Sequence, residues 1–153
     1  MRVLFAEDDS PKARNVSNFL SGLLLALDID HRQSVRSALG ALKSPAYDLL
    51  LLDISLPTFD ISGSERGGRP QSAGAMEILD YMSYAEIDVP TLLITQHEAF
   101  DFEGVTLPLI EMKARMESRY SNYRGLVQYN AISGQWKDDL RQLLTTLGML
   151  RND

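Results

Sequence analysis

The sequence has no cysteine among its 153 residues. This absence excludes disulfide bonds, thiol nucleophiles and cysteine-ligated zinc, and it fits the reducing cytoplasm that we expect as the location. Long apolar runs are also absent, because the stretch 20–27 is short and is interrupted by Ser21 and Gly22, so we expect neither a signal peptide nor a membrane span. The net charge of −6, without a basic stripe, argues against a nucleic-acid surface.

What is present is typical of a globular chain, with 44% hydrophobic and 24% charged residues. We expect one domain over residues 1–153. Short apolar segments alternate with helical periodicity, and the expected strands are 2–6, 28–32, 48–53, 90–95 and 125–129. The last helical face begins near Trp136 and reaches Leu147. This alternation predicts an α/β fold with a doubly wound parallel sheet, right-handed crossovers and helices on both faces.

Acidic residues end two of the expected strands. The first strand runs into Glu7 and Asp8, and the buried leucine run of the third strand ends at Asp53. In a doubly wound sheet these strand ends lie side by side at the point where the strand order reverses. Three carboxylates so close repel one another unless a hard divalent cation neutralises them, and Mg²⁺ suits such oxygen ligands. The open alternative is that these acids only cap a helix and a turn.

Thr95 ends the fourth strand, next to the third. Its hydroxyl is in a position to hydrogen-bond a phosphoryl group carried by Asp53, although strand threonines are commonly structural. An aspartate beside Mg²⁺ is able to act as a nucleophile toward phosphorus and form an acyl phosphate. These residues therefore indicate phosphoryl chemistry at the carboxyl edge of the sheet.

Taken in order, these segments resemble the receiver domain of two-component response regulators (CheY-like). The resemblance rests on Val3–Asp9 with its acidic pair, on Asp53-Ile-Ser-Leu-Pro57 followed by Asp60, and on Pro90–Thr95. It implies a flavodoxin-like sheet of five strands in the order 2-1-3-4-5. It also implies that Asp53 is the phosphoacceptor and that Thr95 is the phosphoryl-contacting switch.

The resemblance further implies that Asp8, Asp53 and the Ser55 backbone carbonyl bind Mg²⁺, with Glu7 acting mainly through bound water. It implies a regulatory domain and not an enzyme. The expected partners are a histidine kinase or phosphotransfer protein and a downstream protein, and homodimerisation is left open.

The sequence departs from the family pattern at three places. Gly74 is the counterpart of the glycine that usually follows the acid at Asp60, so residues 61–73 are an insertion. The segment 96–124 is longer than usual, and we expect its part 96–106 to be irregular.

The third departure is the missing lysine after the fifth strand, where Tyr129 or Asn130 stands, and Leu126 takes the place of the aromatic switch residue. Without that cation a phosphoryl dianion is held less well. Arg66 and Arg69 of the insertion are candidate replacements, whereas Lys137 lies far along the last helix.

Two alternatives to a phosphorylated receiver remain open. One is a pseudo-receiver that works as a phosphorylation-independent interaction or dimerisation module. The other is a Mg²⁺-dependent phosphatase on the same fold, although Ser55 stands where haloacid-dehalogenase-type phosphatases carry a second acid. A flavin site is disfavoured because the loop after the first strand is acidic and repels phosphate.

Overall fold

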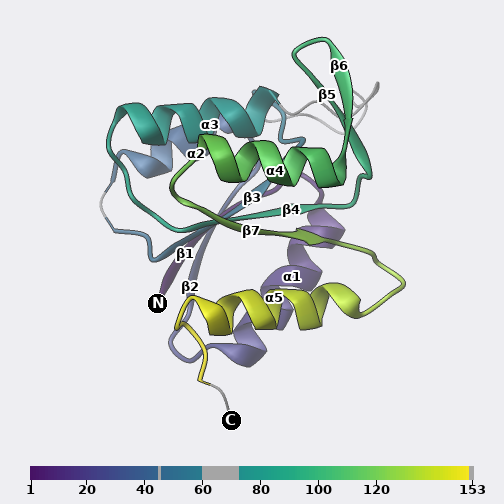
Figure 1. Cartoon of the computed structure of the whole chain (residues 1–153). Helices are drawn as coiled ribbons and strands as arrows, with labels where there is room; N and C mark the ends of the chain where they lie inside the picture. Colours follow the sequence, from purple (N-terminus) through teal and green to yellow (C-terminus); the bar gives the residue numbers. More distant parts are fainter. Residues whose placement is uncertain (45, 60–72, 152–153) are drawn as a thin grey trace.

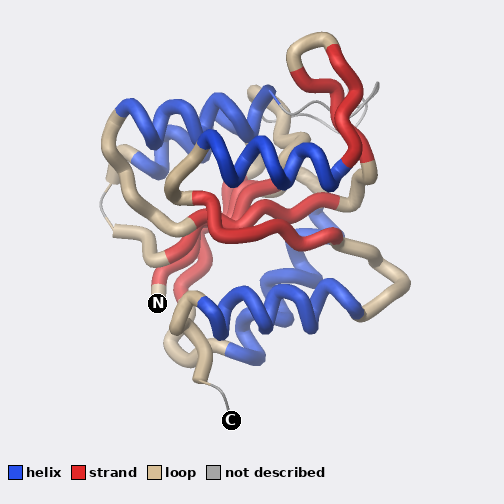
Figure 2. Tube along the Cα trace, viewed as in Figure 1, coloured by secondary structure: helices blue, strands red, loops and turns tan. Residues whose placement is uncertain are grey.

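A computed structural model of the chain describes residues 1–44, 46–59 and 73–151. Five parallel strands form a sheet in the order β2-β1-β3-β4-β7, which confirms the predicted strand order (Figures 1 and 2). The strands and helices are β1 Arg2–Ala6, α1 Ser10–Leu23, β2 Asp28–Arg32, α2 Val35–Leu42, β3 Leu49–Asp53, α3 Ala73–Tyr84, β4 Thr91–Thr95, β5 Ala99–Phe102, β6 Val105–Pro108, α4 Leu109–Arg119, β7 Tyr123–Gln128 and α5 Gln135–Thr146. No helix in the described ranges is both long and apolar enough to cross a membrane.

Two apolar cores lie on opposite faces of the sheet, because side chains alternate along each strand. Leu50 and Leu52 of β3 pack in the core under α2, α3 and α4, whereas Leu49 and Leu51 pack in the core under α1 and α5. Figure 1 shows α2, α3 and α4 above the sheet and α1 and α5 below it. β3, four leucines followed by Asp53, is buried on both faces, as the sequence predicts for a central parallel strand.

The expectation of irregular structure over 96–106 is wrong. An antiparallel hairpin of β5 and β6 lies there and projects beside the start of α4 (Figure 1). Phe100 and Phe102 alternate inward along β5, and Glu103 and Gly104 form the two-residue turn with φ of 50° and 81°. Positive φ at both central residues is the geometry that a tight hairpin turn favours. The sequence signal for this hairpin was the alternation of apolar and polar residues over 100–102, directly before Glu103-Gly104.

The last strand of the sheet is also shifted from its expected bounds. β7 begins two residues earlier than predicted, at Tyr123, and ends at Gln128, which pairs with Thr95 of β4. Tyr129 is therefore the first residue beyond the strand, and its backbone N–H donates to the Thr95 carbonyl at 2.7 Å. This register fixes which residue follows the last strand at the carboxyl edge.

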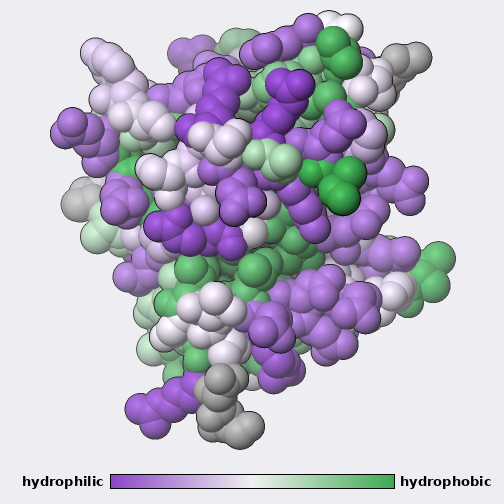
Figure 3. All heavy atoms as spheres, in the orientation of Figure 1, coloured by the Kyte–Doolittle hydropathy of each residue, from purple (hydrophilic) through white to green (hydrophobic). Residues whose placement is uncertain are grey.

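The surface in the view of Figure 3 is mostly polar over α4 and α5. Apolar atoms gather between these two helices, along the exposed edge of the sheet formed by β7. Most of insertion 61–73 and the residues Asp60, Arg66 and Arg69 lie outside the described residues, so the predictions made for them stay predictions.

Candidate functional site

The carboxyl edge of the sheet brings together the acids of β1 and β3. Glu7, Asp8 and Asp53 each offer a carboxylate oxygen, and these oxygens all lie within 4.8 Å of one another. Glu7 and Asp53 are 0% and 1% exposed, whereas Asp8 is half-buried. The meeting of these acids follows from the parallel pairing of β1 with β3, in which Ala6 lies opposite Leu52. The roles predicted for them as ligands and acceptor are not decided by this geometry.

Local backbone structure orients each acid. The N–H of Asp9 donates to a Glu7 carboxylate oxygen at 3.2 Å, and Asp9 in turn caps α1 by accepting the N–H of Lys12. The Ser55 N–H and hydroxyl both donate to Asp53 Oδ1 at 3.3 Å. The loop after Asp53 is itself fixed, because the Pro57 carbonyl accepts the N–H of Val35 at the start of α2.

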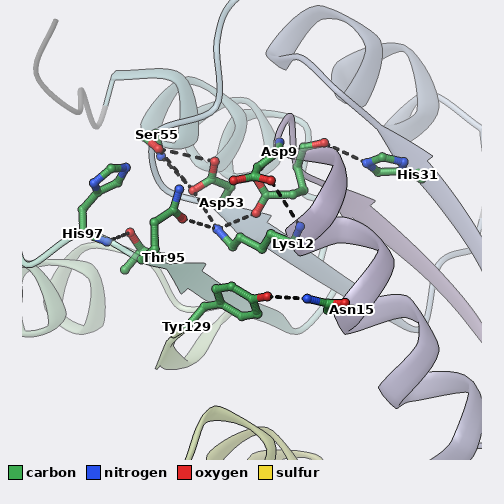
Figure 4. Close-up of polar contacts among 11 residues, drawn as sticks. Asp9, Lys12, Asn15, His31, Asp53, Ser55, Thr95, His97 and Tyr129 are labelled. Carbon is green, nitrogen blue, oxygen red and sulfur yellow. Dashed lines mark hydrogen bonds and ion pairs between the residues drawn. The ribbon is translucent and has the colours of Figure 1, made fainter. Parts of the chain in front are cut away.

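Thr95 lies at the end of β4, fully buried. Its Oγ1 accepts the backbone N–H of His97 at 3.1 Å, and no described residue accepts the hydrogen of its hydroxyl (Figure 4). The hydroxyl therefore retains the capacity to donate one hydrogen bond. Burial is the main cause that lowers the pKa of His97, against the opposing charge of Asp53. His97 thus lies beside the acidic cluster, where burial disfavours the charged form of its ring.

Lys12 is the residue at this site that the sequence interpretation missed. Its ammonium Nζ lies 2.5 Å from Glu7 Oε1, 3.6 Å from Asp53 Oδ1 and 2.7 Å from Gln96 Oε1. Figure 4 shows the side chain extending from α1 between the acids and the residues after β4. The available signal was a lysine on the apolar face of a helix, in phase with Val16 and Leu20.

Burial and the charges of its neighbours set the ionisation of Glu7. Desolvation is the largest cause that raises the pKa of its carboxyl, and the charge of Asp53 raises it further. The ammonium of Lys12 acts in the opposite direction, both by its charge and by its contact. The net result raises the pKa of Glu7 to about 8, so Lys12 offsets only part of the cost of an ionised Glu7 beside Asp53.

The end of β7 presents no cation to the cluster. Tyr129 follows the strand, with its hydroxyl accepting a hydrogen bond from Asn15 Nδ2 at 2.9 Å and its ring 5.1 Å from that of Trp136. Lys12 Nζ lies 5.9 Å from the centre of the Tyr129 ring. Lys137 instead lies over the rings of Phe19 and Trp136 at the start of α5. Leu126, the residue predicted at the aromatic switch position, packs in the core beneath α4.

The fold resembles those of known receiver domains. No protein-family model matches the sequence. The structure is similar to the CheY-like receiver domain protein of Methanospirillum hungatei JF-1, with a TM-score of 0.60, 15% identity and coverage of 96% of this chain and 93% of that one. It is also similar to the RcsB response regulator of Salmonella typhimurium, with a TM-score of 0.63 and 14% identity. The chain is covered completely in that comparison but spans only 65% of RcsB.

A relative in sequence adds to this likeness in fold. The chain is 27% identical over 150 residues to the Detocs response regulatory protein DtcB of Enterobacter cloacae, and the match covers 96% of this chain and all of that protein. The chain therefore has the fold of CheY-like receiver domains and is similar in sequence to a response regulatory protein.

Proposed function

We propose that this receiver domain accepts a phosphoryl group on Asp53 with the help of Mg²⁺ and passes the signal on through protein–protein contacts. The observation that carries the proposal is the cluster of carboxylate oxygens from two separate strands, within 4.8 Å of one another, around the buried Asp53. A histidine kinase or phosphotransfer protein is the proposed donor, and a downstream protein the proposed recipient. The proposed role is regulatory and not enzymatic, and the proposed location is the cytoplasm.

The donor set fits Mg²⁺, which prefers a few carboxylates and completes its octahedron with water. Glu7, Asp8 and Asp53 would hold the ion, and the resemblance adds the Ser55 carbonyl. When bound, the ion offsets negative charge on the attacking carboxylate and on the transferred group.

Asp53 is the proposed nucleophile of the chemical step. One of its carboxylate oxygens forms a bond to phosphorus while the bond from phosphorus to the donor breaks, and the leaving group keeps the electron pair. With acetyl phosphate as donor, acetate leaves and no proton is transferred. The Thr95 hydroxyl, which retains its donor capacity, is the proposed partner of a phosphoryl oxygen.

The decisive measurement is intact mass after incubation with acetyl phosphate and Mg²⁺. We expect the wild-type chain to gain one phosphoryl group and Asp53→Asn to gain none. Asp48→Asn is the matched control, because Asp48 lies at the opposite end of β3 and its carboxylate accepts the N–H of Arg2. A phosphoryl group on both Asp53→Asn and wild type would overturn the assignment of the acceptor.

A pseudo-receiver is the second candidate, and Tyr129 favours it. An aromatic ring stands at the end of β7, so no cation from that strand end is available to couple a phosphoryl group to a change in the domain. In this case the wild-type chain would bind Mg²⁺ but gain no phosphoryl group. The domain would then act by binding a partner independently of phosphorylation. Magnesium binding by calorimetry beside the mass measurement separates the two candidates.

A further inference from the structure

The acidic cluster already contains a cation of its own. Lys12 is 2% exposed, and its ammonium contacts oxygens of Glu7, Asp53 and Gln96. The chain has four lysines, and the other three, Lys43, Lys113 and Lys137, are exposed. Burying an ammonium costs several kcal/mol unless it is paired and hydrogen-bonded. The contacts to the acids and to Gln96 supply that pairing.

The fold of α1 places Lys12 there for a local reason. Asp9 caps the helix, Pro11 occupies its first turn, and Lys12 is in the same turn. The inward face continues with Val16 and Leu20, so Lys12 is the polar end of a buried stripe. Its stem packs under the site while its ammonium reaches the carboxyl edge of the sheet, as Figure 4 shows.

The charges in the acidic cluster are not matched by Lys12 alone. Three carboxylates face one ammonium, and Glu7 Oε1 accepts no hydrogen bond from any described residue apart from its ion pair with Lys12. A divalent cation that binds Glu7 must therefore share or displace the ammonium. Phosphorylation of Asp53 would change the charge on that side chain from −1 to roughly −2. Both events alter the balance that holds Lys12 in place.

We propose that Lys12 is a resident counter-ion of the acidic cluster, which competes with the divalent cation for Glu7 and then turns to the phosphoryl group on Asp53. The first half stands on the geometry, and the second half rests on the proposed function. Lys12 Nζ is 3.6 Å from Asp53 Oδ1, so a phosphoryl group on Asp53 would lie next to the ammonium. The cation thus reaches the site from α1, and its Nζ lies 5.9 Å from the centre of the Tyr129 ring just beyond β7.

The test compares Lys12→Met with wild type. Methionine keeps an unbranched apolar stem but removes the charge, and Lys43→Met is the control at an exposed lysine that directly follows α2. Because a like charge near the ion is removed, we expect Mg²⁺ to bind roughly tenfold more tightly in calorimetry. Because a charge-assisted contact to the phosphoryl group is lost, we expect the aspartyl phosphate to decay roughly tenfold faster. If Lys12 had only a structural role, Lys12→Met would weaken Mg²⁺ binding and shorten the lifetime of the aspartyl phosphate together, or would change neither.

A measurement on the wild-type chain covers the case in which Lys12→Met does not fold. In a chain labelled with ¹³C at the lysine ε-carbons, the single buried lysine gives the signal that is insensitive to surface reagents. We expect this signal to shift on saturation with Mg²⁺ and to shift again on phosphorylation. A Lys12 signal that stays in place through Mg²⁺ saturation, or an unchanged Mg²⁺ affinity in folded Lys12→Met, overturns the proposal.

Failure of the proposed function has a different signature. A wild-type chain that binds Mg²⁺ but gains no phosphoryl group removes the acceptor role of Asp53 and, with it, the second half of the proposal. The competition between Lys12 and Mg²⁺ for Glu7 is then decided by the affinity measurement alone. Tighter binding in Lys12→Met supports it, and equal binding overturns it.

Discussion

The two ends of the site differ in how they handle charge. On the side of β1 and β3, three carboxylates converge and a buried ammonium from α1 lies among them. On the side of β7, Tyr129 packs on Trp136 and hydrogen-bonds Asn15, with an open cavity of about 470 Å³ beside it. The cation that lies beside the acids therefore comes from α1 and not from the end of β7.

The two sides also differ in how tightly their loops are packed. A Cβ added to Gly74 would lie 2.1 Å from the Leu56 carbonyl oxygen in the loop after Asp53, and 2.9 Å from a Val35 methyl group. A Cβ added to Gly134, in the loop after β7, would meet nothing within 4 Å. The acidic side is therefore built around a close approach of backbone, and the aromatic side is open.

The largest effect that we expect tests this difference in packing. Gly74→Ala should lower the free energy of unfolding by about 3 kcal/mol, because the backbone at Leu56 must move to admit the methyl group. Gly134→Ala, its counterpart on the open side, should cost less than about 1 kcal/mol, which is the scale of a weakened helix cap. Urea unfolding followed by circular dichroism measures both. Equal losses would show that the two loops are packed alike.

The second prediction concerns a variant in which the cation is placed at the end of β7 in place of α1. In a Lys12→Met background, Tyr129→Lys should lengthen the lifetime of the aspartyl phosphate roughly tenfold, because the end of β7 then supplies the charge. Tyr129→Met in the same background is the control for loss of the ring without gain of charge. The decay of the phosphorylated mass reports the result. No difference between the lysine and methionine variants would mean that the β7 side cannot serve the site.

The smallest effect concerns the hydroxyl on the aromatic side. Tyr129→Phe removes the acceptor of the hydrogen bond from Asn15, which should lower stability by about 0.5–1 kcal/mol. The ring and its packing on Trp136 remain, so Mg²⁺ affinity should stay at the wild-type value. Thermal unfolding and calorimetry check the two statements. A change in Mg²⁺ affinity would show that the hydroxyl is coupled to the acidic side.

Much of the fold could be predicted from the sequence, because hydrophobic periodicity and the residues that end the apolar runs indicate where the helices and strands lie. The leucine run before Asp53, the apolar faces of α1 and α5, and the alternation of elements predicted the sheet and its order. The hairpin of β5 and β6 was missed, because the alternation along β5 is short and lies in a segment rich in acids. The convergence of Glu7, Asp8 and Asp53 was predictable, since parallel strands place their carboxyl ends at one edge.

Local sequence determined where β1 and β3 end, and hence which acids meet, whereas the end of β7 was set by its pairing with β4. Only the tertiary structure decided that the cation comes from Lys12, because its distance from Asp53 depends on how α1 packs on the sheet. In the sequence Lys12 is one charged residue at the start of a helix, and its spacing from other residues does not indicate which acid it contacts. The ends of β1 and β3 are fixed by periodicity, whereas the contact of an ammonium with acids 5 and 41 residues away is fixed by packing.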